Sequence, residues 1–242
     1  MRVDLNMDVG EGANNEVELF PFISSCNIAC GGHAGNHQTI ECVIKLAQEH
    51  KVNIGAHPSF PDKRNFGRVV MDISNEDLKT SIIKQLELFK AIASDCCAVI
   101  HHVKAHGALY NLAAQDLNTA KTFLLAVKEV LVCPIYAPFN SMMADEAQRI
   151  GIGVIYEAFA DRRYNDDLSL VSRSKPNALI QNPEEMLEQV KGLIKYSKVK
   201  TINGIFKDLR ADTICIHSDT EGAEYLVHKL FDGLMASGIE VS

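Results

Sequence analysis

The sequence lacks the features that would tie it to a membrane or to nucleic acid. Its 242 residues contain no run that approaches the roughly 20 apolar residues of a membrane span, and Met1–Asp8 shows no apolar signal core. Positive charge is in deficit, because 24 Lys and Arg face 31 Asp and Glu and leave a net charge of −7. A negatively charged chain is poorly suited to nucleic acid or to an anionic membrane. We therefore expect a cytoplasmic protein with no membrane or nucleic-acid partner.

Several widespread catalytic and metal-binding motifs are also missing. The seven cysteines include no Cys-x-x-Cys pair, and Cys26 and Cys30 are not spaced like a zinc knuckle. Gly10-Glu11-Gly12 lacks the third glycine of a dinucleotide fingerprint, and the chain has no Walker loop, Gly-x-Ser-x-Gly elbow or His-Glu-x-x-His. Because the cysteines are odd in number and lie mostly in apolar runs, we expect buried, reduced thiols.

What the chain does contain is a regular alternation of short apolar runs and longer amphipathic runs. The short runs predict strands at Val3–Val9, Ser25–Cys30, Val52–Ala56, Ala98–Lys104, Pro134–Pro138, Gly153–Phe159 and Thr213–His217. The longer runs predict helices at Thr39–Glu49, Asn75–Ala93, Leu117–Val130, Ser141–Arg149, Pro183–Tyr196 and Glu221–Met235. Ser74 and the pair Asn182-Pro183 are helix-start signals that agree with two of these ranges.

This alternation predicts an α/β fold. No linker or shift in composition divides the chain, so we expect one domain over residues 1–242. Strands that alternate with helices are typical of a parallel sheet, which is either open and doubly wound or closed into a barrel. The length and the even spacing fit the barrel, so we predict a seven-stranded (β/α) TIM-like barrel. Residues 16–23 are too few for a crossover helix, and we expect an irregular first connection.

Polar residues gather where the predicted strands end. Because residues two apart share a face of a strand, Asp4, Asn6 and Asp8 point the same way, as do His102, Lys104 and His106. Other strand ends carry His33, His57, Glu157 with Asp161, and His217 with Asp219. Parallel α/β folds place active sites at the carboxyl ends of their strands. We therefore expect one convergent polar site, in which carboxylates on neighbouring strands face the Lys104 ammonium.

These residue types allow several kinds of chemistry at the predicted site. Asp8 or a neutral imidazole could deprotonate water, Lys104 could stabilise charge on an oxygen, and several His with Asp could hold a divalent metal. Spacing alone does not choose among them. In the polar loop 62–68, Arg64 or Arg68 could clamp a carboxylate or phosphate, unless the loop is only a solvated connection.

Seven segments, read in order, resemble the LamB/YcsF family. They are "DLNMDVGEG" (4–12), "SSCNIACGGHAGN" (24–36), "IGAHPSFPDKRNFGR" (54–68), "HHVKAHGALYN" (101–111), "EAFADRRYNDDLSLVSRS" (157–174), "ALI" (178–180) and "CIHSDT" (215–220). The characterised members of this family are the A subunits of bacterial ATP-dependent 5-oxoprolinase. The chain departs from the usual family pattern at Gly32, Asn36, Ala105 and Ser218, where phenylalanine, aspartate, proline and glycine are common.

The resemblance implies a barrel akin to the glycoside hydrolase and deacetylase barrels. It also implies hydrolytic opening of 5-oxoproline (pyroglutamate) to L-glutamate, with ATP as co-substrate and with subunits B and C as partners. ATP would bind either at the barrel rim or on a partner subunit. Whether a divalent metal takes part stays open, and Asn36 removes one charged ligand from any metal site that would need it.

Together, the residues and the resemblance nominate two groups of site residues. The predicted catalytic residues are Asp8, His57, Lys104, His106 and His217. The predicted substrate-binding residues are Asn6, Glu11, Asn27, His33, Arg64, Arg68, Asp161, Arg162, Arg173 and Asp219. Asp8 or His57 is expected to act as base, Lys104 to meet the oxygen or phosphate, and His106 or His217 to deliver a proton. Arg64 is expected to bind the substrate carboxylate.

Two other functions compete with this hypothesis. A stand-alone metal-dependent deacetylase or amidohydrolase would lose activity with a chelator and would not need ATP. A non-catalytic binding subunit would change its affinity, but not its partner's turnover, when Asp8 or His57 is substituted. The crowding of ionisable groups favours catalysis.

Overall fold

Parallel strands follow one another around a closed ring in the computed structural model, which describes residues 1–220 and 222–242. The ring consists of β1 (Arg2–Val9), β2 (Ser25–Ala29), β3 (Asn53–His57), β4 (Ile100–Val103), β5 (Ile135–Pro138), β6 (Val154–Phe159) and β9 (Thr213–Cys215). Each strand pairs in parallel with the next, and β9 pairs with β1 to close the barrel. The predicted seven-stranded barrel is therefore confirmed, and all seven predicted strands lie within a few residues of their observed bounds.

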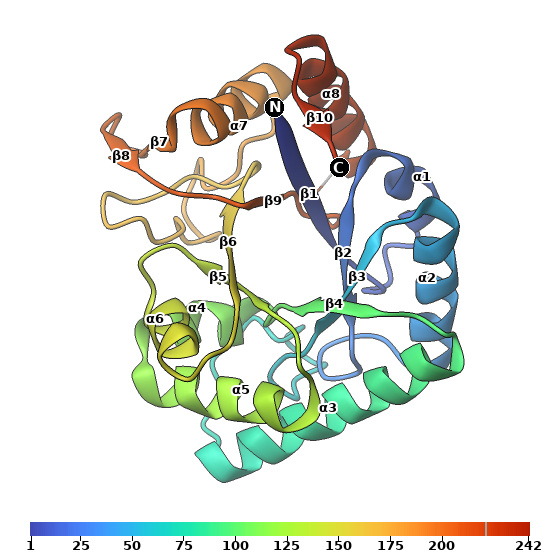
Figure 1. Ribbon diagram of the computed structural model, residues 1–242. Coiled ribbons are helices and arrows are strands. Elements are labelled where there is room, and N and C mark those ends of the chain that lie inside the picture. Colours follow the sequence, from blue (N-terminus) through green and yellow to red (C-terminus); the bar gives the residue numbers. More distant parts are fainter. Residues whose placement is uncertain (221) are drawn as a thin grey trace.

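Helices surround this ring on the outside (Figure 1). They are α2 (His37–His50), α3 (Asn75–Asp95), α4 (Gly107–Gln115), α5 (Leu117–Val130), α6 (Met142–Arg149), α7 (Pro183–Tyr196) and α8 (Ala223–Ala236). The side chains of Ser74 and Asn182 accept hydrogen bonds from Asp77 N and Glu185 N, so both predicted start signals are N-caps. The last helix was predicted to begin at Glu221, which lies outside the described residues. In the structure, α8 begins at Ala223.

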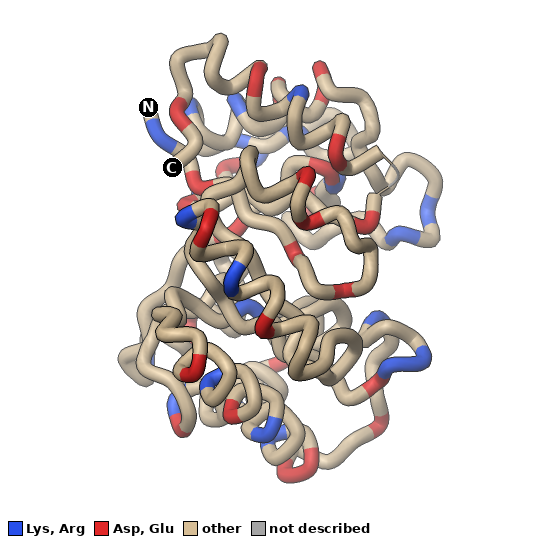
Figure 2. Tube along the Cα trace, turned by 90° about the vertical axis from the view of Figure 1, so that its right-hand side faces the viewer, with Lys and Arg blue, Asp and Glu red and all other residues tan. Residues whose placement is uncertain are grey.

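Some elements were not predicted. Helix α4 follows β4 almost directly, and the hairpin of β7 (Lys198–Lys200) and β8 (Phe206–Asp208) is antiparallel. Strand β10 (Glu240–Val241) pairs with the start of β1, which puts the two chain ends side by side, as Figures 1 and 2 show. Two- and three-residue strands are too short to display alternation. The first connection is irregular as expected, with α1 (Glu16–Leu19) and a 3₁₀ turn (Phe20–Phe22).

The two faces of β1 show how the fold positions polar groups. Val3, Leu5, Met7 and Val9 are buried in the apolar core between the strands and the helices. The alternate residues project into the barrel and form polar layers. Asp4 accepts hydrogen bonds from Ser24 and Ser25 in one layer, Asn6 donates to Thr213 Oγ1 (2.8 Å) in the next, and Asp8 lies at the carboxyl end. The strand therefore delivers Asp8 to the rim.

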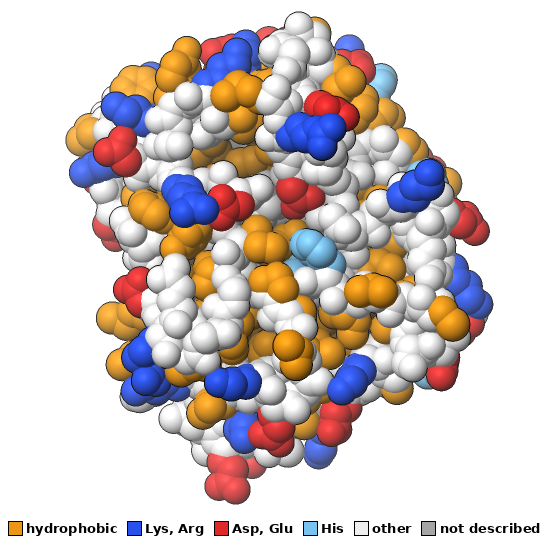
Figure 3. Space-filling view, viewed as in Figure 1, with side chains coloured by type: hydrophobic (Ala, Val, Ile, Leu, Met, Phe, Trp, Pro, Cys, Tyr) orange, Lys and Arg blue, Asp and Glu red, His pale blue; other side chains and the backbone are white. Residues whose placement is uncertain are grey.

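Charges of both signs are spread over the protein. Lys and Arg are interspersed with Asp and Glu along the chain and on the face that Figure 3 shows. Among the described residues, each helix is too short or too polar to cross a membrane. The seven cysteines, all within the described ranges, are free thiols, and Cys26, Cys30 and Cys215 are buried while Cys42 and Cys97 are exposed.

Candidate active site

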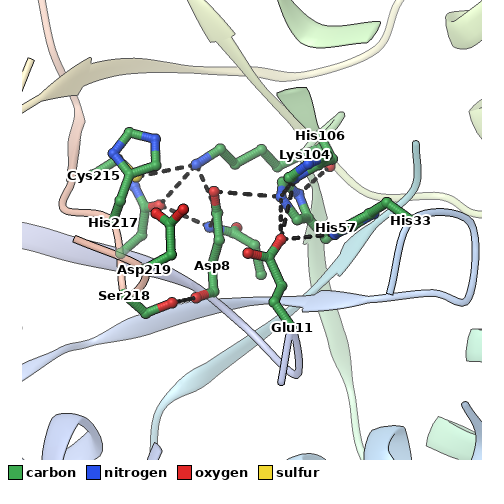
Figure 4. A network of polar contacts seen from close by, with 12 residues as sticks. Asp8, Glu11, His33, His57, Lys104, His106, Cys215, His217, Ser218 and Asp219 are labelled. Carbon is green, nitrogen blue, oxygen red and sulfur yellow. Dashed lines mark hydrogen bonds and ion pairs between the residues drawn. The ribbon is translucent and has the colours of Figure 1, made fainter. Parts of the chain in front are cut away.

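Lys104, just past the end of β4, is the centre of a buried ion-pair cluster at the carboxyl end of the barrel (Figure 4). Its Nζ lies 2.9 Å from Asp8 Oδ1 and 2.9 Å from Glu157 Oε1. The lysine side chain is 3% exposed, and those of Asp8 and Glu157 are 9% and 0% exposed. A buried ammonium is tolerated only with such partners. Carboxylates do face Lys104 as expected, but they come from β1 and β6 across the barrel mouth and not from β3 and β5, the strands next to β4.

The three hydrogens of the Lys104 ammonium all have neighbours. Nζ donates hydrogen bonds to Asp8 Oδ1 and, at 3.2 Å, to Cys215 Sγ, and Asn6 Oδ1 lies at 3.5 Å, while the contact with Glu157 Oε1 is an ion pair. Burial raises the pKa of the Cys215 thiol well above 9.0, although the Lys104 charge opposes that rise, so the sulfur is an uncharged and weak acceptor. Cys215 is therefore the partner that Lys104 gives up most readily when another acceptor arrives.

The ion pairs outweigh desolvation at this cluster. Burial favours the neutral form of both groups, yet the charges of His57 and Lys104 hold the pKa of Asp8 well below 3.8. Burial likewise opposes the charged form of Lys104, yet Asp8 and Glu157 hold its pKa well above 10.5. Lys104 is thus a fixed positive charge at neutral pH, and it does not serve as a base.

The tautomers of His57 and His106 follow from their backbone contacts. Nδ1 of His57 lies 2.8 Å from the Lys104 carbonyl oxygen, and Nε2 of His106 lies 2.9 Å from the Phe66 carbonyl oxygen. A carbonyl only accepts, so both of these nitrogens carry hydrogen. The remaining nitrogens, His57 Nε2 and His106 Nδ1, face each other at 3.0 Å. In two neutral rings they would both present lone pairs to the same point.

Two carboxylates also approach the contact between His57 Nε2 and His106 Nδ1, so a positive charge is needed there to stabilise the cluster. Asp8 Oδ2 lies 3.4 Å from His57 Nε2, and Glu11 Oε1 lies 3.1 Å from His106 Nδ1. Burial lowers the pKa of His57, but the Asp8 carboxylate outweighs burial and raises it above 6.5, whereas burial dominates at His106 and lowers its pKa. A proton on His57 Nε2 therefore satisfies the cluster. A divalent cation would satisfy it too, because Asp8, His57 and His106 offer one O and two N donors within 4.8 Å of one another.

His33 and Glu11 support this cluster from one side. His33 Nε2 lies 2.7 Å from Glu11 Oε1, and its ring stacks on that of His106 with centroids 3.6 Å apart. Burial is the main reason that the pKa of His33 falls to about 4, with the Glu11 hydrogen bond opposing it. His33 is therefore a neutral donor that holds Glu11 in place.

His217, which follows β9, has a carboxylate behind it. Its Nδ1 lies 2.9 Å from Asp161 Oδ2, and its backbone N–H donates to the same oxygen at 3.1 Å. Asp161 is fully buried, yet the charge and hydrogen bonds of His217 lower its pKa below 3.8. Nδ1–H thus points at Asp161, and in the neutral ring Nε2 carries a lone pair for which the described residues supply no hydrogen-bond partner. This arrangement suits a base or a proton carrier.

A cavity of about 830 Å³ opens above these groups. It is lined by all five predicted catalytic residues, and by Glu11, Arg68, Arg162 and Arg173 of the predicted substrate-binding set. The sequence therefore identified most of the charged groups that meet here. What each of them does stays a prediction.

The other predicted substrate-binding residues lie behind the cavity or outside it. Asn6 and Asn27 are fully buried beneath Asp8, and Asn27 Nδ2 donates to both Asn6 Oδ1 and Asp8 Oδ1 at 2.8 Å. They position the ion-pair cluster. His33 supports Glu11, Asp161 supports His217, and Asp219 contacts Arg68 and Arg173. Arg64 is exposed on its loop and is not among the described lining residues, so Arg68, Arg162 and Arg173 are better placed to bind an anion.

Three residues in or beside this cluster were absent from the predicted catalytic and substrate-binding groups. Glu157 is the second carboxylate on Lys104, Tyr110 is a buried phenol whose pKa burial and Glu157 raise well above 10.0, and Cys215 is the third neighbour of Lys104. Glu157 stood out as a charged residue in a predicted strand. Tyr110 and Cys215 carried no such signal, because aromatic and thiol side chains are ordinary in an apolar core.

The chain matches known proteins over its whole length. The LamB/YcsF family profile matches residues 3–242. The chain belongs to the LamB/YcsF family. It is 40% identical over 248 residues to the A subunit of 5-oxoprolinase from Staphylococcus saprophyticus, in a match that covers 100% of this chain and 98% of that protein. The crystal structure of a lactam utilization protein from Thermus thermophilus matches with a TM-score of 0.93 and 37% identity, over 100% and 99% of the two chains.

A more distant structure shares the fold alone. The T48 deacetylase matches with a TM-score of 0.50 and 13% identity, over 99% of this chain and 86% of that one. The expected likeness of the LamB/YcsF chain to deacetylase barrels is thus confirmed for the fold.

The structure gives a reason for one departure from the family pattern and shows the place of a second. A Cβ added at Gly32 would lie 2.4 Å from both Gln85 Oε1 and Ser59 Oγ, because the Gln85 side chain fills this space and bonds to the Ser59 backbone. Asn36 caps α2 by accepting a hydrogen bond from Thr39 N. In this LamB/YcsF chain, Asn36 is therefore an exposed helix cap, whereas Asp8, His57 and His106 of the donor set are buried.

Proposed function

We propose that this chain is the A subunit of an ATP-dependent 5-oxoprolinase and opens 5-oxoproline to L-glutamate together with subunits B and C. The observation that carries the proposal is the 40% identity, over the whole chain, to a protein named as the A subunit of 5-oxoprolinase. The Lys104 cluster supports it, because a fixed ammonium beside two histidines inside a cavity suits the opening of an amide.

The chemistry explains why ATP is needed. A five-membered lactam is an unactivated amide with a poor leaving nitrogen. In the proposed route, the lactam oxygen forms a bond to the γ-phosphorus of ATP, and the bond from that phosphorus to the bridging oxygen breaks to release ADP. Water then adds to the activated carbon, a proton passes to the nitrogen, and the C–N bond breaks. A second water hydrolyses the resulting acyl phosphate to glutamate and phosphate.

Lys104 is the group that we assign to the lactam oxygen. That oxygen carries the negatively charged phosphoryl group once it is phosphorylated, and a fixed positive charge in a buried site stabilises this group. Because Cys215 is the weak third neighbour, Lys104 can turn one N–H from the sulfur to the substrate while it keeps Asp8 and Glu157. Asp8 and Glu157 then hold the ammonium in place.

For the two histidines we propose a division of labour that differs from the one expected from the sequence. His217 has a lone pair on Nε2 and Asp161 behind Nδ1, so it is suited to take a proton from water. His57 has a raised pKa, and a proton on its Nε2 satisfies both Asp8 and His106, so it is suited to give a proton to the ring nitrogen. Asp8, with its lowered pKa, is a weak base and serves His57 and Lys104 as their counter-charge.

Glutamate release tests the proposal. The purified chain is mixed with its candidate B and C subunits and 5-oxoproline, and glutamate is followed with and without ATP and with and without chelator. We expect release that requires ATP. Release that proceeds equally well without ATP would contradict the proposal.

A second candidate is a stand-alone metal-dependent amidohydrolase or deacetylase. The donor set of Asp8, His57 and His106 favours it, since a carboxylate and two imidazoles are ligands that divalent zinc accepts. A metal bound there would lower the pKa of a coordinated water. This candidate predicts activity without ATP and without partner subunits, and loss of activity with a chelator.

A further inference from the structure

A second set of charged groups lines the same cavity and is positive. Arg68 lies on the loop after β3, Arg162 follows β6, and Arg173 lies on the long connection to α7. We call these three residues the arginine wall. Arg68 and Arg173 both contact Oδ2 of Asp219, the latter at 3.5 Å. Among the described residues, Asp219 is thus the one carboxylate that contacts the arginine wall, which carries three guanidinium groups.

Arg162 is the member of the arginine wall that most clearly lacks an anion. It is 7% exposed, and its Nη2 donates to the Val171 carbonyl oxygen at 2.7 Å. Its Nε is buried, and the described residues supply no hydrogen-bond partner for it. Burial, followed by the charge of Arg173, lowers the pKa of Arg162. The Asp161 charge opposes that fall, but among the described residues no carboxylate lies within ion-pair distance of the Arg162 guanidinium, so this position is suited to an incoming oxyanion.

The cavity has room for more than a single-ring lactam. Its volume of about 830 Å³ lies near the upper end of the roughly 300–1,000 Å³ that is typical of pockets for drug-sized ligands. Hydroxyl donors accompany the arginine wall, because Ser172 and Ser174 also line the cavity and their Oγ atoms lie 2.9 Å apart. The lactam and a nucleotide can therefore share the one cavity.

We propose that the arginine wall binds the triphosphate chain of a nucleoside triphosphate, so that the nucleotide site lies on this chain. The inference rests on the proposed function. One guanidinium is enough to bind a carboxylate in a bidentate pair, whereas three guanidinium groups from three segments match a ligand with several charged phosphates. The Lys104 cluster lines the same cavity, which brings the phosphates and the lactam oxygen into one enclosure.

Equilibrium dialysis of the full chain, with labelled ATP as the probe, tests the site directly. We expect ATP to bind, inorganic tripolyphosphate to compete with it, and adenosine not to compete. Arg162→Gln and Arg173→Gln should each weaken ATP binding by about tenfold or more, because each removes charge-assisted hydrogen bonds to phosphate. Arg163→Gln is the matched control. Arg163 is the neighbour of Arg162, but it pairs with Glu185 and should leave ATP binding unchanged.

Parallel dialysis with labelled 5-oxoproline separates a phosphate from the substrate carboxylate. If Arg162→Gln and Arg173→Gln weaken 5-oxoproline binding and leave ATP binding intact, the wall is a carboxylate site and the proposal is overturned. Absent ATP binding to this chain, while the assembled enzyme still releases glutamate only with ATP, would also overturn it and leave the proposed function standing. ATP binding at the wall without any glutamate release would support the site and end the proposed function.

Discussion

Replacing Lys104 by methionine tests whether the ion-pair cluster is held together by its central charge. The substitution removes the ammonium and keeps an unbranched side chain of similar length. Asp8 and Glu157, each 2.9 Å from Nζ, would then be left as two buried carboxylates without their cation. Lys104→Met should therefore lower the free energy of unfolding.

The size of this loss follows from burial and distance. With an effective dielectric constant of about 20, two opposite unit charges 2.9 Å apart attract by roughly 6 kcal/mol, and the cost of desolvating the ammonium offsets much of this. Removing one partner of a buried ion pair costs about 3–5 kcal/mol. We expect a loss of that size, about 3–5 kcal/mol at pH 7, which is a large share of the roughly 5–15 kcal/mol of a typical domain.

The loss should depend on pH with a definite sign. The pKa of Asp8 is lowered on folding, so its contribution is present above 3.8 and is lost as the pH falls through the lower folded value. The pKa of Lys104 is raised, so its contribution is present below 10.5 and is lost only as the pH rises through the higher folded value. In Lys104→Met the buried carboxylates take up protons more readily. The difference between the two proteins should therefore shrink as the pH falls from 7 toward about 4.

Urea denaturation followed by circular dichroism at pH 7 and at pH 4.5 measures this difference. Lys84→Met, on the exposed face of α3, is the control and should change stability by less than about 0.5 kcal/mol. In a background of Asp8→Asn and Glu157→Gln, the methionine should cost little. An undiminished loss in that background, or the same loss at both pH values, would refute the electrostatic reasoning.

Three further predictions follow from single residues. His57→Gln should lower glutamate release by about 100-fold or more, because it removes the imidazole with the raised pKa beside Asp8, while the exposed His37→Gln should be without effect. Gly32→Ala should lower the free energy of unfolding by about 1–3 kcal/mol in thermal or urea denaturation, because the new Cβ overlaps Gln85 and Ser59, and Gln85→Ala should relieve much of the loss. Asn36→Ala should cost about 1 kcal/mol of stability and leave turnover unchanged, since the residue caps α2; a large loss of turnover would instead point to a ligand.

Periodicity was enough to predict the strands and most of the helices. The strands of the barrel are buried and bounded by polar residues, so short apolar runs mark them well, and the caps Ser74 and Asn182 fix two helix starts. Helix α4 was not predicted, because Gly107 opens it directly after the polar rim of β4 and its buried residues include the polar-tipped Tyr110. Strands β7 and β8 are too short to show alternation.

Many of the charged residues that line the cavity could also be predicted from the sequence. The carboxyl ends of parallel strands converge, so Asp8, His57 and Lys104 could be brought together from strand positions alone. Loop residues could not be placed in this way. Arg64 and Arg68 looked equivalent in the sequence, yet only Arg68 lines the cavity among the described residues. The roles of the histidines depend on tautomers, and these are set by backbone carbonyls that no sequence pattern displays.

The most direct test of the central claim is the rate of glutamate release by the assembled enzyme carrying Asp8→Asn. Asp8 is the carboxylate that contacts both Lys104 and His57, whereas Asp62→Asn, on an exposed loop, is the matched control. With ATP and 5-oxoproline saturating, and with folding checked by circular dichroism, we predict a loss in kcat of about 100-fold or more for Asp8→Asn and an unchanged kcat for Asp62→Asn. A folded Asp8→Asn enzyme that turns over at the wild-type rate would show that the lactam is opened elsewhere.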